Sequence, residues 1–316
     1  MFTFKTNAGP LIEDPILITG VQRSGTSLLG SLVGSLTEIE YDYEPWIWGN
    51  LPIMAQSESG INEAAVKVLL EGYTYELFSN HVLARNVNMR KTDMSCKAYF
   101  KSENEVQRRW ENLHDRTDVR KWVKENNIKL AFKLVNAEPF IQLFLDIFPK
   151  GKVIHIVRDP FDAALSAAEK GWMNLKEFSS VESADVRKVA KGKGDYFFPW
   201  WLKDGDEDRF LAFNEAERAL YAWTTVMESF SHKVVLESNY HLIRYENLIS
   251  NGDLMVSELC SFLGKSKTPL TEQIAHSIKK DNSKKYTEEL IAQWNSDLVQ
   301  KALGIFDSFE TVDKEL

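Results

Sequence analysis

Cysteine is scarce in this sequence, which contains only Cys96 and Cys260 among its 316 residues. Two cysteines so far apart cannot supply a disulfide framework or a zinc site, so the composition favours a reducing compartment. The histidines show no spacing typical of metal ligands, and we therefore expect no metal site. They are His81, His114, His155, His232, His241 and His276.

Positive charge is also in deficit, because the sequence contains 38 Lys and Arg residues but 46 Asp and Glu residues, which gives a net charge of -8. This balance excludes a broad electrostatic grip on nucleic acid or on an anionic membrane. No apolar stretch reaches the length of a membrane span, and the first residues lack the basic and apolar segments of a signal peptide. We therefore expect a cytoplasmic protein whose anion binding is confined to local pockets.

The sequence does contain a glycine-spaced turn between a short apolar run and a helical pattern. Gly20 and Gly25 are separated as in the phosphate-binding loop G-x-x-x-x-G-K-[ST], and Ser27 stands at its last position. Glycines let backbone N–H groups converge on an anion, and the following helix adds its unpaired donors. Thr26 replaces the loop lysine, and Arg23 is the only cation inside the turn. The turn predicts phosphate binding without ordinary ATP or GTP hydrolysis. The alternative is a plain strand, turn and helix.

Apolar and helical patterns alternate along the rest of the chain. Short runs typical of strands occur at 39–44, 130–135, 152–157 and 240–246, and helical patterns occur at 28–36, 62–85, 139–148, 160–170 and 214–233. A strand, a helix and a second strand in succession indicate a parallel βαβ unit. We expect a single α/β domain over residues 1–316, built on a P-loop-type open parallel sheet flanked by helices.

Two insertions interrupt this pattern. Residues from about 50 to 127 predict a helical cap, with a loop over 47–61 and one helix from the Ser102-x-x-Glu105 capping box to about Asn126. Residues 171–212 have no sustained period but contain aromatic residues between Tyr196 and Trp201. That segment either offers aromatic surface over the site or is a surface segment fixed by buried aromatics. Helices are expected to complete the C-terminal part of the chain.

Several charged residues fall at or near the ends of the expected strands. An open parallel sheet places ligands at the carboxyl ends of its strands. A carboxylate beside a bound phosphate could take the proton of a hydroxyl group, and Glu44 is suited to that role. The alternative for Glu44 is a turn cap or an ion pair with Arg23. The strand-end residues are Arg23, Glu44, Lys133, Arg158 and Arg244.

Three motifs, in this order, resemble those of the sulfotransferases that use 3′-phosphoadenosine 5′-phosphosulfate (PAPS). Gln22-Arg-Ser-Gly-Thr-Ser27 resembles their 5′-phosphosulfate loop in its arginine variant. Val157-Arg158-Asp-Pro, with Ser166 eight residues past Arg158, resembles their 3′-phosphate motif, and Arg244-Tyr-Glu-Asn-Leu248 resembles their strand-to-helix junction. Tyr43-Glu44-Pro45 is similar to the Phe-Glu-Pro of sugar 6-O-sulfotransferases. The likeness is therefore to the carbohydrate and tyrosylprotein branches.

This resemblance implies transfer of a sulfuryl group from PAPS to a hydroxyl acceptor, without a metal. It implies that Glu44 is the catalytic base and that Arg23 acts with it, helped by the amides of residues 24–27. Ser283, Lys284 and Lys285 resemble a C-terminal loop that closes over the nucleotide in relatives. The implied nucleotide-binding positions are Arg23, Ser24, Gly25, Thr26, Ser27, Arg158, Ser166, Tyr245, Ser283, Lys284 and Lys285.

The sequence departs from the family pattern at one place. Many relatives carry a catalytic lysine just beyond the third strand, where this chain has Asn136-Ala137. Lys133 lies nearby, inside the strand, and whether it takes that role is open. Cytosolic members use a histidine as base, so His81 and His114 keep that alternative open.

Two other functions compete with sulfuryl transfer. A P-loop nucleotide kinase shares the loop and sheet but needs a lysine at position 26 and a magnesium-binding acidic residue. A non-catalytic nucleotide-binding protein of the same fold would bind the product nucleotide, adenosine 3′,5′-bisphosphate (PAP), without transfer. The expected acceptor is a hydroxyl-bearing small molecule or glycan, with a carbohydrate preferred and nucleic acid excluded. A homo-oligomer is left open.

Overall fold

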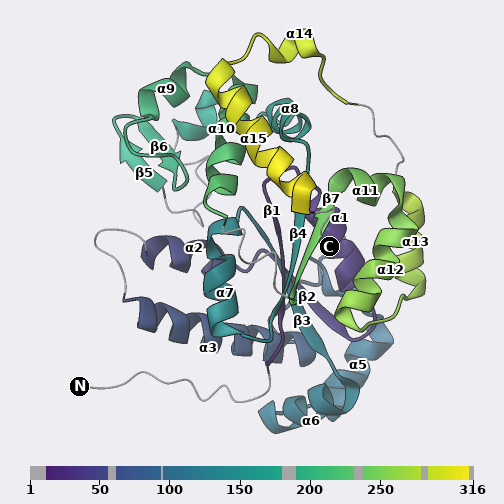
Figure 1. Cartoon of the computed structure of the whole chain (residues 1–316). Helices are drawn as coiled ribbons and strands as arrows, with labels where there is room; N and C mark the ends of the chain where they lie inside the picture. Colours follow the sequence, from purple (N-terminus) through teal and green to yellow (C-terminus); the bar gives the residue numbers. More distant parts are fainter. Residues whose placement is uncertain are drawn as a thin grey trace.

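A five-stranded parallel sheet forms the centre of the molecule, with strand order β2-β3-β1-β4-β7 (Figure 1). The computed structural model describes residues 12–55, 62–93, 95–179, 190–230, 238–278 and 284–312. The strands are β1 (Ile16–Gly20), β2 (Ile39–Tyr43), β3 (Lys129–Val135), β4 (Lys152–Val157) and β7 (Tyr240–Arg244). The predicted fold class, an open parallel sheet flanked by helices, is confirmed.

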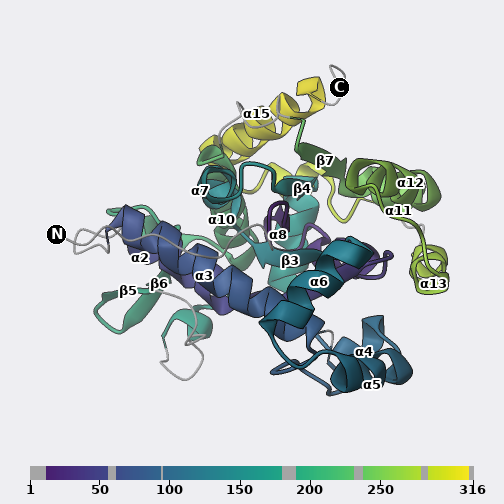
Figure 2. The same cartoon turned by 90° about the horizontal axis from the view of Figure 1, so that it is seen from below.

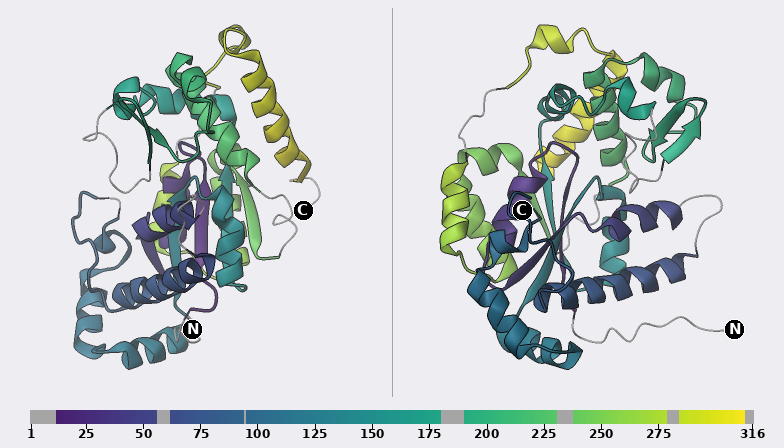
Figure 3. Two further views of the ribbon diagram at one scale, coloured as in Figure 1. Left: turned by 90° about the vertical axis from the view of Figure 1, so that its left-hand side faces the viewer. Right: turned by 180° about the vertical axis from the view of Figure 1, so that it is seen from behind.

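Helices cover both faces of the sheet, so its strands are buried on both sides (Figures 1 and 3). Leu17 belongs to one apolar core, whereas its neighbours Ile16 and Ile18 belong to the other. One face carries α1 (Thr26–Gly34), α11 (Tyr245–Ser250), α12 (Gly252–Leu263) and α13 (Pro269–Ser277). The other carries α2 (Trp46–Ala55), α3 (Glu63–Val82), α7 (Ile141–Ile147), α8 (Pro160–Glu169), α10 (Glu215–Glu228) and α15 (Ser296–Val312).

The loop expected over 47–61 is wrong for its first part, because α2 is a helix from Trp46 to Ala55 with Pro52 inside it. Packing stabilises this helix where local propensity does not. The Trp48 ring is buried 5.6 Å from the ring of Phe132 on β3, and its Nε1 donates to Thr74 Oγ1 at 2.9 Å.

The single helix expected from Ser102 to about Asn126 is also wrong, since two helices occupy the region. They are α5 (Glu103–Asn112) and α6 (Arg116–Asn126). The Ser102 hydroxyl caps the first helix by accepting from the Glu105 amide at 3.2 Å. Asp115 begins the second with a complete capping box. The capping box at Asp115 starts a new helix within the stretch for which the sequence pattern predicted one continuous helix.

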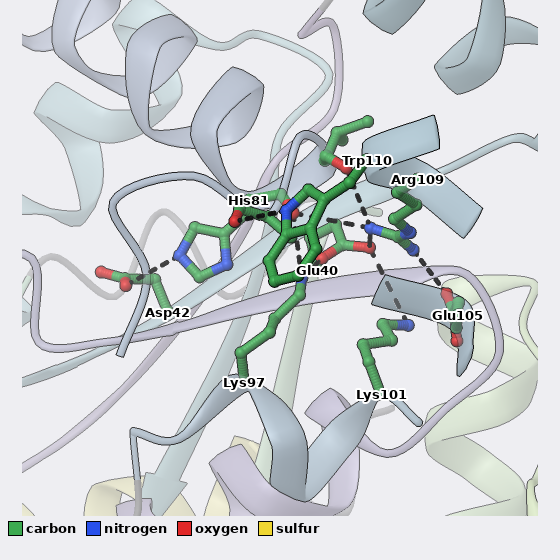
Figure 4. A network of polar contacts seen from close by, with 10 residues as sticks. Glu40, Asp42, His81, Lys97, Lys101, Glu105, Arg109 and Trp110 are labelled. Atoms are coloured by element: carbon green, nitrogen blue, oxygen red, sulfur yellow. Dashed lines mark hydrogen bonds and ion pairs between the residues drawn. The ribbon is translucent and has the colours of Figure 1, made fainter. Parts of the chain in front are cut away.

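A buried ionic network joins the helical cap to the edge strand β2. Glu40 on β2 is fully buried and contacts Lys97 on the short helix α4 (Lys97–Phe100) and Arg109 on α5, the latter at 2.8 Å (Figure 4). Lys101 approaches the same carboxylate at 3.9 Å. In Figure 2, α4, α5 and α6 extend beside the sheet, so these ion pairs anchor the cap at its edge.

The 171–212 insertion contains more regular structure than its sequence predicts. Beside the 3₁₀ turn Leu175–Phe178, it forms an antiparallel hairpin of β5 (Ala190–Lys193) and β6 (Tyr196–Pro199), followed by α9 (Glu207–Ala212). Phe198 and Trp201 are buried against Phe210. These contacts favour the surface segment fixed by buried aromatics over an aromatic platform.

The described residues also form a 3₁₀ turn at Glu138–Phe140 and the short helix α14 (Glu288–Ile291). Among the described residues, no helix combines the length and apolarity needed to cross a membrane.

Candidate functional site

The glycine-spaced turn connects the end of β1 to the first residue of α1. Arg23 and Gly25 have left-handed backbones, with φ of 69° and 94°, and the Ser24 amide donates to the Val21 carbonyl at 3.0 Å. A Cβ atom on Gly25 would lie only 2.6 Å from the ring of Tyr245. Only glycine satisfies both the backbone angle and this close approach.

The start of α1 leaves donors available for an anion. Gly25 is its N-cap and provides no side-chain cap, and the first turn carries no acidic residue. The first amides of a helix have no intrahelical partner, and the helix dipole favours negative charge there. Among the amides expected at 24–27, that of Ser24 donates to the Val21 carbonyl within the turn.

Unusual backbone geometry gathers at the carboxyl ends of three neighbouring strands. Arg23 after β1, Glu44 after β2 and Asn136 after β3 have φ of 69°, 55° and 59°. Such conformations cost on the order of 1–3 kcal/mol each and persist where surrounding contacts impose them. Asn136 shows these contacts, since its Oδ1 accepts from the Gln22 amide at 3.0 Å. These three are among seven non-glycine residues with positive φ in the described part of the chain, and all three lie at the predicted site.

Glu44 lies beside a buried lysine that comes from the middle of β3. Lys133 is 1% exposed, and its Nζ lies 2.6 Å from Glu44 Oε1 and 3.4 Å from Ser27 Oγ. The Glu44 amide also donates to the Lys133 carbonyl at 3.0 Å. The ion pair that was the alternative for Glu44 therefore exists, but with Lys133 instead of Arg23. The acid, the cation and the phosphate-loop hydroxyl form one contact network.

The residues of the second motif contact the first motif directly. An Arg158 side-chain nitrogen donates to the Arg23 carbonyl at 3.0 Å, and Arg23 Nε donates to Ser166 Oγ at 3.1 Å. The guanidinium of Arg158 stacks on the Tyr245 ring at 4.3 Å. The guanidinium of Arg23 stacks on Trp172 at 5.1 Å. The structure thus brings Arg23, Arg158, Ser166 and Tyr245 together, although they are distant in sequence.

The C-terminal segment lies on the N-terminal turn of α8. The Tyr286 hydroxyl donates to Asp159 at 2.9 Å, and the Lys285 amide donates to Asp162 at 2.8 Å. Burial raises the pKa of Asp162, whereas the hydrogen bond to Tyr286 raises the pKa of Lys284. Lys284 and Lys285 are therefore next to the Arg158 segment, with Lys285 Nζ paired to Glu169. Ser283 lies outside the described residues.

The donors around the turn fit a phosphorylated nucleotide. Within the described part of the chain, Ser24 Oγ, Gln22 Nε2 and Arg158 Nε are buried and have no hydrogen-bond partner. A hydroxyl, an amide and a guanidinium are donors suited to phosphate oxygens, which only accept. Unsatisfied buried donors are costly, so their position beside an uncapped helix N-terminus favours an anionic ligand.

Sequence reasoning did not foresee that Trp172 stacks on Arg23 or that Tyr286 donates to Asp159. Trp172 stands three residues past the end of α8, the helix that carries Ser166, and this position was the available signal. Neither alternative histidine is in the network around Glu44. His81 contacts Asp42 at 3.0 Å. Asp42 and Tyr43 are successive residues of β2, so their side chains point to opposite faces of the sheet. His114 is exposed on the cap.

The sheet and the turn together define a P-loop-type α/β protein. The model of the sulfotransferase family matches residues 15–269, which is more than half of this 316-residue chain. The chain belongs to the sulfotransferase family.

Several solved structures similar to this chain are named as sulfotransferases. The sulfotransferase domain from the curacin biosynthetic pathway is 15% identical, with a TM-score of 0.48 over 95% of this chain and 98% of that one. A sulfotransferase from Alicyclobacillus acidocaldarius is 14% identical, with a TM-score of 0.44 and coverages of 91% and 92%. A mouse sulfotransferase in complex with PAP is 12% identical, with a TM-score of 0.43 and coverages of 96% and 89%. No curated protein matches the chain.

Proposed function

We propose that this protein transfers the sulfuryl group of PAPS to a hydroxyl acceptor, with Glu44 as the general base. The observation that carries the proposal is the contact network in which Lys133 Nζ lies 2.6 Å from Glu44 and 3.4 Å from Ser27. A carboxylate and a cation beside a turn suited to the donor phosphosulfate support this proposal.

Each end of the donor nucleotide has its own group of residues in this proposal. Arg23, Ser24 and the first turn of α1 would hold the 5′-phosphosulfate, with Gly25, Thr26 and Ser27 supplying amides and hydroxyls. Arg158 and Ser166 would hold the 3′-phosphate, with Tyr245, Lys284 and Lys285 alongside. PAPS supplies the activated sulfuryl group, and the protein supplies orientation and fixed positive charge.

The proposed transfer balances without a metal. The acceptor oxygen forms a bond to sulfur while the bond from sulfur to the bridging phosphate oxygen breaks, and PAP leaves with that electron pair. The acceptor proton passes to the Glu44 carboxylate. Lys133 and Arg23 stabilise negative charge on the sulfuryl oxygens and on the departing phosphate, as charged donors do for phosphoryl groups.

A carbohydrate hydroxyl is the acceptor we propose, within the wider class of hydroxyl-bearing small molecules and glycans. The Tyr43-Glu44-Pro45 likeness supports it. The Trp46 side chain, two residues past Glu44, supports it as well, because it is 53% exposed and offers a ring face to a sugar. Both described cysteines are free thiols, which supports a cytoplasmic location.

Radiolabelled PAPS offered with sugars, phenols, peptides and sterols tests the function directly. We expect transfer to a hydroxyl acceptor in the presence of EDTA. Glu44→Gln should lower kcat by about 10²- to 10⁴-fold, the usual contribution of a general base, while PAP affinity stays unchanged. Transfer that survives Glu44→Gln would contradict the assigned base, and stabilisation by Mg-ATP instead of PAP would favour a kinase.

Glu38→Gln is the matched control for this experiment. Glu38 stands just before β2, as Glu44 stands just after it, and both have φ of 55°. Glu38 also pairs with a buried lysine, Lys265, at 3.3 Å. It lies at the opposite end of the strand, so its loss should leave kcat and PAP affinity at wild-type values.

A further inference from the structure

Tyr43 faces Lys133 across two paired strands. The two residues are directly opposite in the parallel register of β2 and β3, so their side chains are on the same face of the sheet. Lys133 Nζ lies 3.8 Å from the centroid of the Tyr43 ring. At that distance the ring quadrupole attracts the ammonium group, and the attraction is strongest where water is excluded.

The ammonium group of Lys133 has three N–H donors and three neighbours in this structure. Glu44 Oε1 lies at 2.6 Å, Ser27 Oγ lies at 3.4 Å, and the Tyr43 ring covers a further side. The side chain of Glu44 is 37% exposed, whereas that of Lys133 is 1% exposed. Because the carboxylate is at the surface, pairing with it alone does not fix a flexible lysine. The ring provides the rigid contact.

Tyr43 also reaches the phosphate loop itself. Its hydroxyl lies 3.4 Å from Ser27 Oγ, so one side chain contacts both the loop hydroxyl and the cation beside the base. Loss of the hydroxyl and loss of the ring are therefore separable changes. This distinction decides which part of Tyr43 matters.

We propose that Tyr43 is a positioning residue of the transfer site, whose ring holds the Lys133 ammonium between Glu44 and Ser27. The inference rests on the proposed function and deepens it. Without the ring, Lys133 pairs with the partly exposed Glu44 carboxylate alone and no longer presents its charge at the loop. PAP binding depends on this contact less than transfer does, because most of the assigned nucleotide-binding groups are on the loop, α8, α11 and the segment with Lys284 and Lys285.

Tyr43→Leu and Tyr43→Phe form the test. Tyr43→Leu should lower kcat by roughly 10- to 30-fold, the rate equivalent of one desolvated cation–π contact, with a smaller loss of PAP affinity. Tyr43→Phe keeps the ring and should stay within about threefold of wild type. Equal losses in both variants would overturn the proposal, because the hydroxyl would then be the important group. Wild-type kcat in Tyr43→Leu would overturn it as well.

A spectroscopic readout tests the contact without any activity assay. In protein labelled with ¹³C-lysine, the ring current of Tyr43 should shift the ε-protons of Lys133 upfield, and Lys133→Arg identifies the resonance. The shift should persist in Tyr43→Phe and disappear in Tyr43→Leu. An unshifted wild-type resonance, or one that Tyr43→Leu leaves unchanged, would overturn the proposal.

Tyr41→Leu is the matched control, because Tyr41 is on the same face of the same strand but packs on Gly30 and Gly34 of α1. It should lower stability and leave the Lys133 resonance in place. If the wild-type protein transfers no sulfuryl group to any acceptor, the proposed function fails, and the Lys133 resonance still decides whether Tyr43 holds the ammonium.

Discussion

At the residue scale, the candidate site is built from backbone positions that tolerate little change. Gly25 turns the chain into α1 with φ of 94° and lies against Tyr245 so closely that a Cβ would be 2.6 Å from the ring. Tyr245 in turn supports Arg158, whose guanidinium is stacked on it. The missing side chain at Gly25 thus lets the first motif pack against Tyr245 of the third motif, which in turn supports Arg158 of the second.

Gly25→Ala should therefore weaken nucleotide binding as well as stability. We expect at least about 1–2 kcal/mol of destabilisation from the left-handed backbone alone, and more from the contact with Tyr245. PAP affinity should fall by more than tenfold, since the ring of Tyr245 must move away from Arg158. Urea unfolding and calorimetric titration with PAP measure the two effects.

Gly205→Ala separates backbone strain from the contact. Gly205 has φ of 90°, but nothing lies within 4 Å of the position that its Cβ would occupy. Gly205→Ala should therefore be destabilised by backbone strain about as much as Gly25→Ala, with no change in PAP affinity. Unchanged PAP binding in Gly25→Ala would show that the turn does not contact the nucleotide.

The loop residues and Glu44 could be proposed as candidates from local sequence. The glycine spacing indicates the loop, and Glu44 is a charged residue at the end of an alternating strand. The partner of Glu44 could not be predicted in this way. Lys133 reaches it only because β2 and β3 pair in the register that sets Tyr43 opposite Lys133. Strand pairing is a long-range property that no local pattern encodes. Because this chain has Asn136-Ala137 where many relatives carry a catalytic lysine, the sequence alone could not decide whether Lys133 takes that role.

At the scale of elements, the helical cap depends on Glu40. This carboxylate is fully buried on β2 and contacts Lys97 on α4 and Arg109 on α5 (Figure 4). Breaking a buried ion pair costs more than forming it gains, because the remaining charges keep their desolvation penalty. Two cap elements and the sheet edge share this single acid.

Glu40→Gln should destabilise the protein by about 3–5 kcal/mol, measured by urea unfolding. Partial proteolysis should cut first within the cap, whose helices lose their anchor. Glu103→Gln is the control, since Glu103 pairs with Lys91 at 2.7 Å but both side chains are 74% exposed. The control should unfold like wild type. A stable Glu40→Gln variant would contradict the anchoring role.

The start of α8 was predictable from its local sequence, whereas the start of α6 at Asp115 was not. The helical pattern expected from residue 160 begins there, at Pro160 of α8, and the Asp159 carboxylate before it accepts from the Phe161 amide at 2.9 Å. Helix α2 was not predictable, because its stability comes from burying Trp48 against strands that lie far away in sequence. Tertiary burial outweighs weak local propensity there.

At the scale of the whole molecule, two apolar cores fill the two faces of one sheet, and one of them includes residues from Leu17 to Phe309. This continuity supports the proposed single domain, with about 50–127 and 171–212 as insertions. The strands β2, β3, β1, β4 and β7 run parallel, so their carboxyl ends lie along one edge of the sheet, where all three motifs meet. Fold class could be predicted from alternation, but the strand order could not.

The central claim is that the turn and the Arg158–Ser166 pair hold the two ends of one doubly phosphorylated adenosine. A crystal structure of the protein with PAP measures this most directly. We expect the 5′-phosphate against the first turn of α1 and the 3′-phosphate within hydrogen-bond reach of Arg158 and Ser166. PAP bound elsewhere, or with either phosphate outside its assigned group, would contradict the account.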